Sequence, residues 1–481
     1  MTAATEPLTG HTADHHAEPA EAAGPGRRGL LRFATAGSVD DGKSTLVGRL
    51  LHDSKSVLAD QLDAVHRTSA ERGLDEPDLS LLVDGLRAER EQGITIDVAY
   101  RYFATPQRSF ILADTPGHVQ YTRNTATGAS TADVVVILTD ARSGVVAQTR
   151  RHAAVAALVG VRHLVLVVNK IDLVDYDERV FTRIAADFAG YATGLGVPDV
   201  TAIPVSALHG DNVVTRSERI DWYTGPSVLE YLEQLDTAEP ETDLTSDLGL
   251  RMPVQYVIRP RTAEHPDYRG YAGRIAAGRV RPGDAVVVLP SGRTSTVTAI
   301  DTADGERSQA DAGDSVTLLL ADDLDISRGD LIAARDTAPE PVTEFSATVT
   351  QLAEKPVRIG TRALLRYGTT TTKVIVTGID HLLDIDTLEP TTAPQVLVLN
   401  DIAQLRLRTA DPVPVEDFRP GGAVGALLIV DPADGTTLAA GMVGDRPSAL
   451  RRRADVRRAT GSSDERCQPY TDSDSLSTPG P

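Results

Sequence analysis

The chain has 481 residues, of which 41% are hydrophobic, enough for several buried cores and for about three domains of ~150 residues each. Its net charge of -20 argues against a non-specific nucleic-acid binder, although one basic face can be hidden within an acidic total. A single cysteine, Cys467, excludes a disulfide framework, and no apolar run reaches the ~18 residues that a bilayer crossing needs, so a cytoplasmic protein is expected.

The first 29 residues are rich in Ala, Gly, Pro and His and contain no apolar core of the kind that a signal peptide has. We expect residues 1–29 to form a disordered N-terminal tail. His11, His15 and His16 could bind a metal ion, but in a segment this polar a solvated flexible arm is the favoured interpretation.

Residues 30–240 alternate short apolar segments with longer helical patterns, which is typical of a mostly parallel sheet with flanking helices. Ligands of such α/β domains lie at the carboxyl ends of the strands, so the residues after each strand are the first candidates for a site. The clearest predicted strands are Phe33–Ala36, Ser109–Ala113, Val134–Leu138, Leu164–Asn169 and Thr201–Val205.

A phosphate-binding loop follows the first of these strands. Its pattern is two glycines separated by four residues and followed by Lys and Ser. The glycines let backbone N–H groups turn inward around phosphates, the Lys43 ammonium can bind the β- and γ-phosphates, and the Ser44 hydroxyl can bind Mg²⁺. A plain glycine-rich turn is the alternative, which the preceding strand disfavours. The predicted phosphate site comprises Gly37, Ser38, Val39, Asp40, Asp41, Gly42, Lys43, Ser44 and Thr45.

The segment Arg90–Asp97 lies between this loop and the next predicted strand and contains Gly93 and Thr95. A mobile loop that bears a threonine is what a γ-phosphate-dependent switch needs. The oxygen atoms of Thr95 would complete the Mg²⁺ shell and would be released after hydrolysis. Without the other motifs, this segment would be interpreted as a polar loop.

The second motif is Asp114-Thr115-Pro116-Gly117-His118, directly after the strand Ser109–Ala113. Asp114 can hold Mg²⁺ through a water molecule, the Gly117 N–H can approach a γ-phosphate, and His118 could orient the attacking water. By itself an Asp-x-x-Gly pattern is more often a turn, so its order relative to the phosphate loop gives it meaning.

The third motif, Asn169-Lys170-Ile171-Asp172, predicts which nucleotide base the domain binds. The Asp172 carboxylate can accept two hydrogen bonds from the N1–H and 2-amino groups of guanine, and adenine offers no such pair of donors. The Asn169 amide can bridge the base and the phosphate loop, and the Lys170 stem can cover the ring. The segment Ser206-Ala207-Leu208 follows the strand Thr201–Val205 and can present a backbone N–H to guanine O6, although Ser-Ala alone carries almost no information.

These five elements occur in the order and spacing of one GTPase domain, so we predict a G domain over residues 30–240 that binds GTP and Mg²⁺. The predicted metal ligands are Ser44, Thr95 and Asp114. His118, Lys43 and Thr95 are the predicted catalytic residues.

The remainder of the chain has the sequence pattern of all-β domains. Residues 237–247 are interpreted as a linker, and short Val/Ile/Thr segments broken by Pro, Gly and Asp then predict β-barrels over residues 250–336 and 343–443. Residues 444–481 are Arg-rich and then Ser/Asp/Pro-rich, which predicts a disordered C-terminal tail. For the arginines of this tail, a solvated segment is favoured over a binding function.

The Thr95 region, the Asp114–His118 motif and two following barrels together resemble the translation-factor class of GTPases. Elongation factors of that class usually read Gly-His-Val-Asp-His-Gly-Lys-Thr at the phosphate loop. This chain reads Gly-Ser-Val-Asp-Asp-Gly-Lys-Ser, which is similar to the large subunit of bacterial two-subunit sulfate adenylyltransferase. The resemblance covers roughly residues 30–340, and three further segments within this range carry it: Leu82–Phe103, Tyr121–Asn124 and Asp221–Pro226. Elongation factors of archaea and eukaryotes partly share the last of these.

This resemblance implies a nucleotidyltransferase of sulfate assimilation whose two reactions take place on two different subunits. GTP hydrolysis on this chain would drive the formation of adenylylsulfate and pyrophosphate from ATP and sulfate on a small, ATP-pyrophosphatase-like subunit, within a heterodimer or higher assembly. No membrane or nucleic-acid partner is expected. Some relatives carry a fused adenylylsulfate kinase, which would need a second phosphate loop, and this sequence has none.

Two alternatives remain from the sequence. One is a translation elongation factor that delivers aminoacyl-tRNA, against which Ser38, Asp41 and the acidic total argue. The other is a stand-alone regulatory GTPase, against which the two barrels argue because they imply a large partner.

Overall fold

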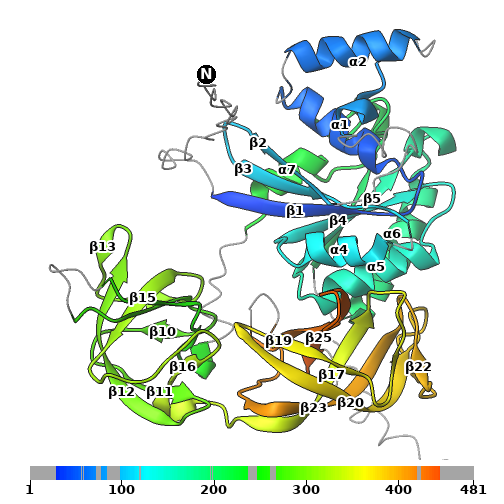
Figure 1. The fold of residues 1–481 in the computed structure, drawn as a ribbon. Coiled ribbons are helices and arrows are strands. Elements are labelled where there is room, and N and C mark those ends of the chain that lie inside the picture. Colours follow the sequence, from blue (N-terminus) through cyan, green and yellow to red (C-terminus); the bar gives the residue numbers. More distant parts are fainter. Residues whose placement is uncertain are drawn as a thin grey trace, which may run out of the picture.

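The computed structural model describes residues 29–55, 57, 59–71, 77–83, 98–118, 121–195, 197, 199–236, 246–260, 267–419 and 424–444. These residues form an α/β G domain followed by two all-β domains, here called domain 2 and domain 3 (Figure 1). The predicted switch segment Arg90–Asp97, residues 1–28 and residues 445–481 lie outside the described residues.

The G domain is built on a six-stranded sheet in the order β2-β3-β1-β4-β5-β6. All neighbouring strands are parallel except β2, which runs antiparallel to β3 at the edge of the sheet, so the predicted mostly parallel sheet is confirmed. The strands are β1 (Leu30–Ala36), β2 (Ala99–Ala104), β3 (Ser109–Asp114), β4 (Val134–Asp140), β5 (His163–Asn169) and β6 (Asp199–Pro204).

Helices cover both faces of this sheet, because its central strands are apolar on both sides; every residue of β4, for example, is buried. One apolar cluster joins α4, α5 and α6 to the sheet, and a second joins α1 and α7 to the opposite face. The helices are α1 (Lys43–Asp53), α2 (Ala59–Glu71), α4 (Thr122–Ala129), α5 (Ala147–Leu158), α6 (Glu178–Leu195) and α7 (Val228–Gln234), with short 3-10 turns η1 (Leu79–Leu82), η3 (Ile171–Val174) and η4 (Glu218–Ile220).

Domain 2 is an antiparallel sheet in the order β7-β16-β11-β12-β15-β9-β8. Its two end strands, β7 and β8, are separated along the chain by only two residues, so the ends of the sheet meet and the sheet curls into a barrel. The strands are β7 (Arg251–Pro253), β8 (Tyr256–Ile258), β9 (Gly270–Arg274), β11 (Ala285–Leu289), β12 (Arg293–Thr302), β15 (Ser315–Leu320) and β16 (Leu331–Ala334), with short pairs formed by β10 (Arg279–Val280), β13 (Gly305–Glu306) and β14 (Ala310–Asp311).

Domain 3 is a closed barrel, because β19 pairs with both β24 and β20 and so joins the two ends of the order β19-β24-β25-β17-β23-β20. Closure leaves these six strands without a free edge. They are β17 (Val342–Gln351), β19 (Arg362–Tyr367), β20 (Thr370–Leu383), β23 (Ile402–Val413), β24 (Ala426–Val430) and β25 (Thr437–Val443), accompanied by β18 (Val357–Arg358), β21 (Pro390–Thr391) and β22 (Val396–Leu397).

Domain 3 also contacts both other domains. Ile402 and Met442 belong to the apolar cluster of α4, α5 and α6, and the Tyr191 hydroxyl donates to the Ile385 carbonyl at 2.7 Å. Toward domain 2, the buried Arg251 guanidinium donates two hydrogen bonds to the Glu416 carboxylate, at 2.7 and 2.9 Å. A buried bidentate pair fixes geometry, since breaking either partner leaves an uncompensated charge.

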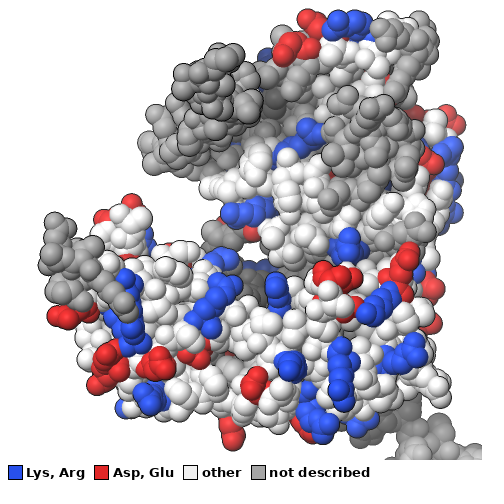
Figure 2. Space-filling model, in the orientation of Figure 1, with Lys and Arg blue, Asp and Glu red and all other residues white. Residues whose placement is uncertain are grey.

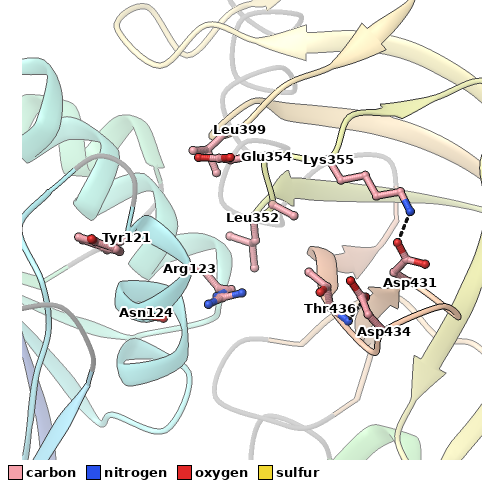
Figure 3. A pocket seen from close by; sticks show the side chains of 11 residues that line it. Tyr121, Arg123, Asn124, Leu352, Glu354, Lys355, Leu399, Asp431, Asp434 and Thr436 are labelled. Atoms are coloured by element: carbon pink, nitrogen blue, oxygen red, sulfur yellow. Dashed lines mark hydrogen bonds and ion pairs between the residues drawn. The ribbon is translucent and has the colours of Figure 1, made fainter.

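A cavity of roughly 320 Å³ lies between α4 of the G domain and domain 3 (Figure 3). Tyr121, Arg123 and Asn124 line its G-domain side, and Lys355 and Asp431, which form an ion pair, lie on the opposite side. Tyr121, three residues after His118 in the sequence, therefore lies at the border between the two domains.

Candidate nucleotide-binding site

The predicted phosphate loop connects the carboxyl end of β1 to the amino end of α1. Gly42 has φ 88° and Asp40 has φ 66°, so the chain turns through left-handed conformations immediately before α1. A Cβ atom at Gly42 would lie 2.4 Å from Asn169 Nδ2, so only glycine fits there. The amino end of α1, with its unpaired N–H groups and positive dipole end, points at the space the loop encloses, which suits an anion.

Lys43 is the first residue of α1 and is buried. Its ammonium donates hydrogen bonds to the carbonyls of Gly37 at 2.9 Å and Ser38 at 2.8 Å, so it spans the mouth of the loop. Burial lowers the pKa of Lys43, and the charge of Asp114 acts against this effect. A phosphate would supply the strong negative partner that this desolvated ammonium needs.

Asp41 is also buried, but its carboxylate is directed to the loop itself: Oδ2 accepts a hydrogen bond from the Ser38 N–H at 2.6 Å. Burial raises the pKa of Asp41, and the hydrogen bond from Ser38 opposes the rise. The sequence motif placed Asp41 among the nucleotide-binding residues. In the structure, the Asp41 side chain joins the second half of the loop to Ser38 in the first half and so closes the loop.

The Asp114–His118 motif lies beside the phosphate loop. Thr35 on β1 donates to Asp114 Oδ1 at 2.7 Å, and the Thr115 hydroxyl donates to the Thr35 carbonyl at 2.6 Å, so the two strand ends are fastened together. A Cβ atom at Gly117 would lie 2.6 Å from the Gly37 carbonyl oxygen and 2.3 Å from Lys43 Nζ. The Gly117 backbone therefore approaches the phosphate loop and its lysine more closely than a residue with a Cβ atom could. His118 is exposed at the end of the motif.

Two of the three predicted metal ligands can be placed. Ser44 lies in the first turn of α1, and Asp114 ends β3, whose neighbour β1 leads into the phosphate loop. Hydroxyl and carboxylate oxygens are the donors that Mg²⁺ prefers, so these residues fit the ion. The third, Thr95, lies outside the described residues and stays a prediction.

The predicted base site lies at the ends of β5 and β6. The Asn169 amide donates to the Asp41 carbonyl at 2.8 Å and accepts from the Ala207 N–H at 3.0 Å, so one side chain holds the phosphate loop and the Ser206–Leu208 segment together. Lys170 extends over the phosphate loop, where its ammonium donates to the Asp40 carbonyl. Asp172 lies in η3 and is partly exposed, as a group that binds a base must be.

The remaining predicted residues are divided between the surface and the interior. Val39 and Leu208 are exposed, Ser44 and Thr45 are half-buried, and Pro116, Ile171 and Ser206 are buried. The structure thus gathers the phosphate loop, the Asp114–His118 motif, the Asn169–Asp172 motif and the Ser206–Leu208 segment at one edge of the sheet. Their contacts with a nucleotide remain a prediction.

Sequence reasoning missed Asp140, the last residue of β4. Its carboxylate lies 3.1 Å from the Lys170 ammonium and accepts from Arg142 Nη2 at 2.6 Å. Burial disfavours the charge of Asp140, but the hydrogen bonds from Arg142 and Lys170 outweigh burial and hold the pKa of this carboxyl well below its usual range. An acidic residue at the end of a strand that begins with five apolar residues was the available signal.

His152 on α5 was missed as well. It is fully buried behind the phosphate loop, and its Nε2 lies 3.1 Å from Gln148 Nε2. Burial, followed by the positive charge of Lys43, lowers the pKa of His152 to about 3. A neutral imidazole therefore supports the loop from behind, which no sequence motif indicates.

The fold and this arrangement define a P-loop GTPase of the elongation-factor type. The family model described as "Elongation factor Tu GTP binding domain" matches residues 28–241, and the model described as "GTP-eEF1A C-terminal domain-like" matches residues 344–444. The solved structure of sup35 complexed with GDP is 27% identical and covers 87% of this chain and 94% of that one, with a TM-score of 0.39.

Curated relatives give a narrower assignment. The chain is 52% identical to "Bifunctional enzyme CysN/CysC" of Mycobacterium tuberculosis over 86% of its length and 67% of that protein's. It is 48% identical to "Sulfate adenylyltransferase subunit 1" of Shewanella oneidensis and 47% identical to the protein of the same name from Bacteroides fragilis, over 86% and 87% of this chain and 85% and 87% of those proteins, respectively. The chain belongs to the sulfate adenylyltransferase subunit 1 family. Within the described residues, no helix is both long and apolar enough to span a membrane.

Proposed function

We propose that this chain is the GTP-hydrolysing subunit of a sulfate adenylyltransferase, and that its hydrolysis of GTP drives the reaction of ATP and sulfate to adenylylsulfate and pyrophosphate on a separate small subunit. The observation that carries this proposal is the identity of 47–48% to proteins named subunit 1, along nearly the whole length of both chains. A numbered subunit implies a partner subunit in those proteins.

The inventory of motifs supports the division of labour. The sequence contains one phosphate loop, and the motif at Asn169–Asp172 favours guanine over adenine. Sulfate activation requires that a sulfate oxygen attack the α-phosphorus of ATP and that pyrophosphate leave. ATP has no second phosphate loop on this chain, so the small subunit is the proposed place of that step.

The roles proposed for the site residues follow from their positions. Lys43 and the N–H groups at the start of α1 bind the β- and γ-phosphates, and Asp172 and the Ser206–Leu208 segment bind guanine. Mg²⁺, held through Ser44, Asp114 and Thr95, would neutralise charge on the phosphates. The exposed His118 orients the water that attacks the γ-phosphorus.

The test is reconstitution with the purified small subunit, ATP, Mg²⁺ and labelled sulfate. We expect adenylylsulfate well above its small equilibrium level only when this chain, the small subunit and GTP are all present. The variant Lys43→Ala should reduce the product to the level found without GTP, whereas Lys55→Gln, which changes an exposed lysine beyond α1, should not. Product formation by this chain alone, or a yield that GTP does not change, would refute the proposal.

A further inference from the structure

Domain 3 carries a concentration of positive charge that the composition of the chain does not predict. The outward positions of three neighbouring strands bear Arg362 and Arg366 on β19, Lys373 on β20, and Arg406 and Arg408 on β23, and all five side chains are exposed. We call this surface the cationic face. Figure 2 shows Lys and Arg gathered over the part of the molecule that domain 3 occupies, in a chain with 48 basic and 68 acidic residues.

The strand register brings these side chains together. Arg362 is opposite Ile375 on β20, and Ile375 is opposite Arg408 on β23, so the two arginines lie two strand spacings, or about 10 Å, apart. Lys373 is two residues, or roughly 7 Å, from Ile375 along the same strand. All of these distances are close to the Debye length of ~8 Å at physiological salt, so the charges repel one another and act as one positive surface.

Few carboxylates compensate this charge. Asp380 pairs with Arg406 at 2.9 Å, and Glu344 lies at the distant limit of pairing with Arg408, at 3.9 Å. Within the described part of the chain, no ion pair involves Arg362, Arg366 or Lys373. Like charges gathered on one sheet face destabilise the free protein, and an acidic partner would remove that cost.

The other outward side chains of these strands indicate the class of the partner. Apart from the carboxylates Asp380 and Asp411 and from Pro412, they are short aliphatic residues and threonines: Leu364, Thr371, Ile375, Thr377 and Ala410. Single-stranded nucleic acid is bound by aromatic side chains that stack on its bases, and these positions carry none. A mixed surface of arginines, threonines and small apolar groups is instead suited to a protein interface.

We propose that the cationic face docks an acidic surface of the small catalytic subunit. This inference rests on the proposed function, which supplies the partner, and goes beyond it by assigning the surface of this chain that holds the partner. The face is accessible for docking because its five basic side chains are exposed and the contacts of domain 3 with the G domain, such as Ile385, Ile402 and Met442, lie elsewhere on the barrel. Domain 2 contacts the end of the face, where the Thr370 hydroxyl in the β19–β20 turn donates to the Gly329 carbonyl at 2.6 Å.

The test measures the affinity of the full-length chain for the purified small subunit at several salt concentrations. The triple variant Arg362→Glu, Lys373→Glu and Arg408→Glu should raise the Kd at least 10-fold at 0.15 M salt and reduce the dependence of Kd on salt. The matched control is Arg281→Glu, Arg293→Glu and Arg307→Glu, which makes the same change of net charge at exposed positions of domain 2. The control should change the Kd less than 3-fold, and both variants should keep the basal rate of GTP hydrolysis.

The outcomes separate the two proposals. If the wild-type chain does not bind the small subunit, the proposed function fails, and the docking surface fails with it. If the wild type binds but the two triple variants behave alike, only the assignment of the cationic face is overturned, because the effect is then one of total charge. The assignment is also overturned if the cationic face instead retains a single-stranded oligonucleotide probe at 0.15 M salt and its triple variant releases that probe.

Discussion

The carboxylate of Asp41 allows a direct test of how the phosphate loop is held closed. It is buried and accepts the Ser38 N–H at 2.6 Å, across the loop that would surround the phosphates. The substitution Asp41→Ala removes this acceptor. The substitution Asp41→Asn keeps an acceptor oxygen and removes the negative charge, so the two variants separate the geometric effect of the residue from its electrostatic effect.

The magnitude follows from the hydrogen bond. A hydrogen bond to a charged group contributes about 1.5–3 kcal/mol, and one between neutral groups contributes about 0.5–1.5 kcal/mol. Because the loop must be closed to bind phosphates, Asp41→Ala should weaken GTP binding roughly 10- to 100-fold, where about 1.4 kcal/mol corresponds to tenfold. Asp41→Asn loses only part of the hydrogen bond and removes a negative charge near the phosphates, so its affinity should equal or exceed that of the wild type.

The assay is equilibrium titration of each variant with a fluorescent GTP analogue at pH 7.5, with melting temperatures measured in parallel. Equal loss of affinity in both variants would show that the charge of Asp41, and not its acceptor oxygen, shapes the loop. Unchanged affinity in both would refute the closing role altogether. Since burial raises the pKa of Asp41, its ionisation is less favourable in the folded chain than in the unfolded chain, and Asp41→Asn should also melt higher than the wild type at neutral pH, with the difference shrinking as the pH falls toward 3.8.

Three further predictions concern the site. Asp172→Asn should weaken GTP binding by more than ~2 kcal/mol, because an acceptor becomes a donor, while xanthosine triphosphate should bind better to the variant than to the wild type; nucleotide titrations decide this, and unchanged GTP affinity would contradict the base assignment. His118→Ala should keep GTP affinity within a few-fold and lower single-turnover hydrolysis ~10²-fold or more, whereas Lys43→Ala should lose binding itself; equal loss of affinity in both would make His118 structural. Because the pKa of His152 is about 3 in the folded chain against an ordinary value of 6.5, the unfolded chain binds the extra proton, so stability should fall as the pH drops from 6.5 toward 3, by up to about 1.4 kcal/mol per pH unit. Denaturant titrations at several pH values give the change of the free energy of unfolding with pH, and for His152→Gln this change should correspond to one proton fewer in this range. An unchanged pH dependence would contradict a neutral buried imidazole.

The strands and motifs of the G domain could be predicted because their signals are local. The predicted strand Ser109–Ala113 is β3 lacking only Asp114, and Leu164–Asn169 is β5 lacking only His163. In a parallel sheet the carboxyl ends of neighbouring strands share one edge, so motifs more than 100 residues apart along the chain necessarily converge there. The antiparallel edge strand β2 was not predicted, because its residues Tyr100 and Tyr102 are exposed and it lacks the apolar run of a buried strand.

What could not be predicted depends on contacts between segments that carry no motif. Asp140 fixes the orientation of Lys170, and His152 supports the phosphate loop from α5, but each is an ordinary polar residue in its own segment. The cationic face has the same origin. Arg362 and Arg408 are 46 positions apart in the sequence, and only the register of β19, β20 and β23 makes them neighbours.

The arrangement of the three domains connects the nucleotide site to this distant face. Helix α4 begins at Thr122, four residues after His118, and Ala126 of this helix packs on Leu352 of domain 3. If loss of a γ-phosphate moves the Asp114–His118 motif, we expect the movement to act on the border that contains the cavity of Figure 3. Because domain 3 is a closed, packed barrel, we expect it to respond to such a force by rotating as a body, which would carry the cationic face with it. A partner held on that face would be displaced relative to the G domain, which is the mechanical requirement for coupling GTP hydrolysis to a reaction on another subunit.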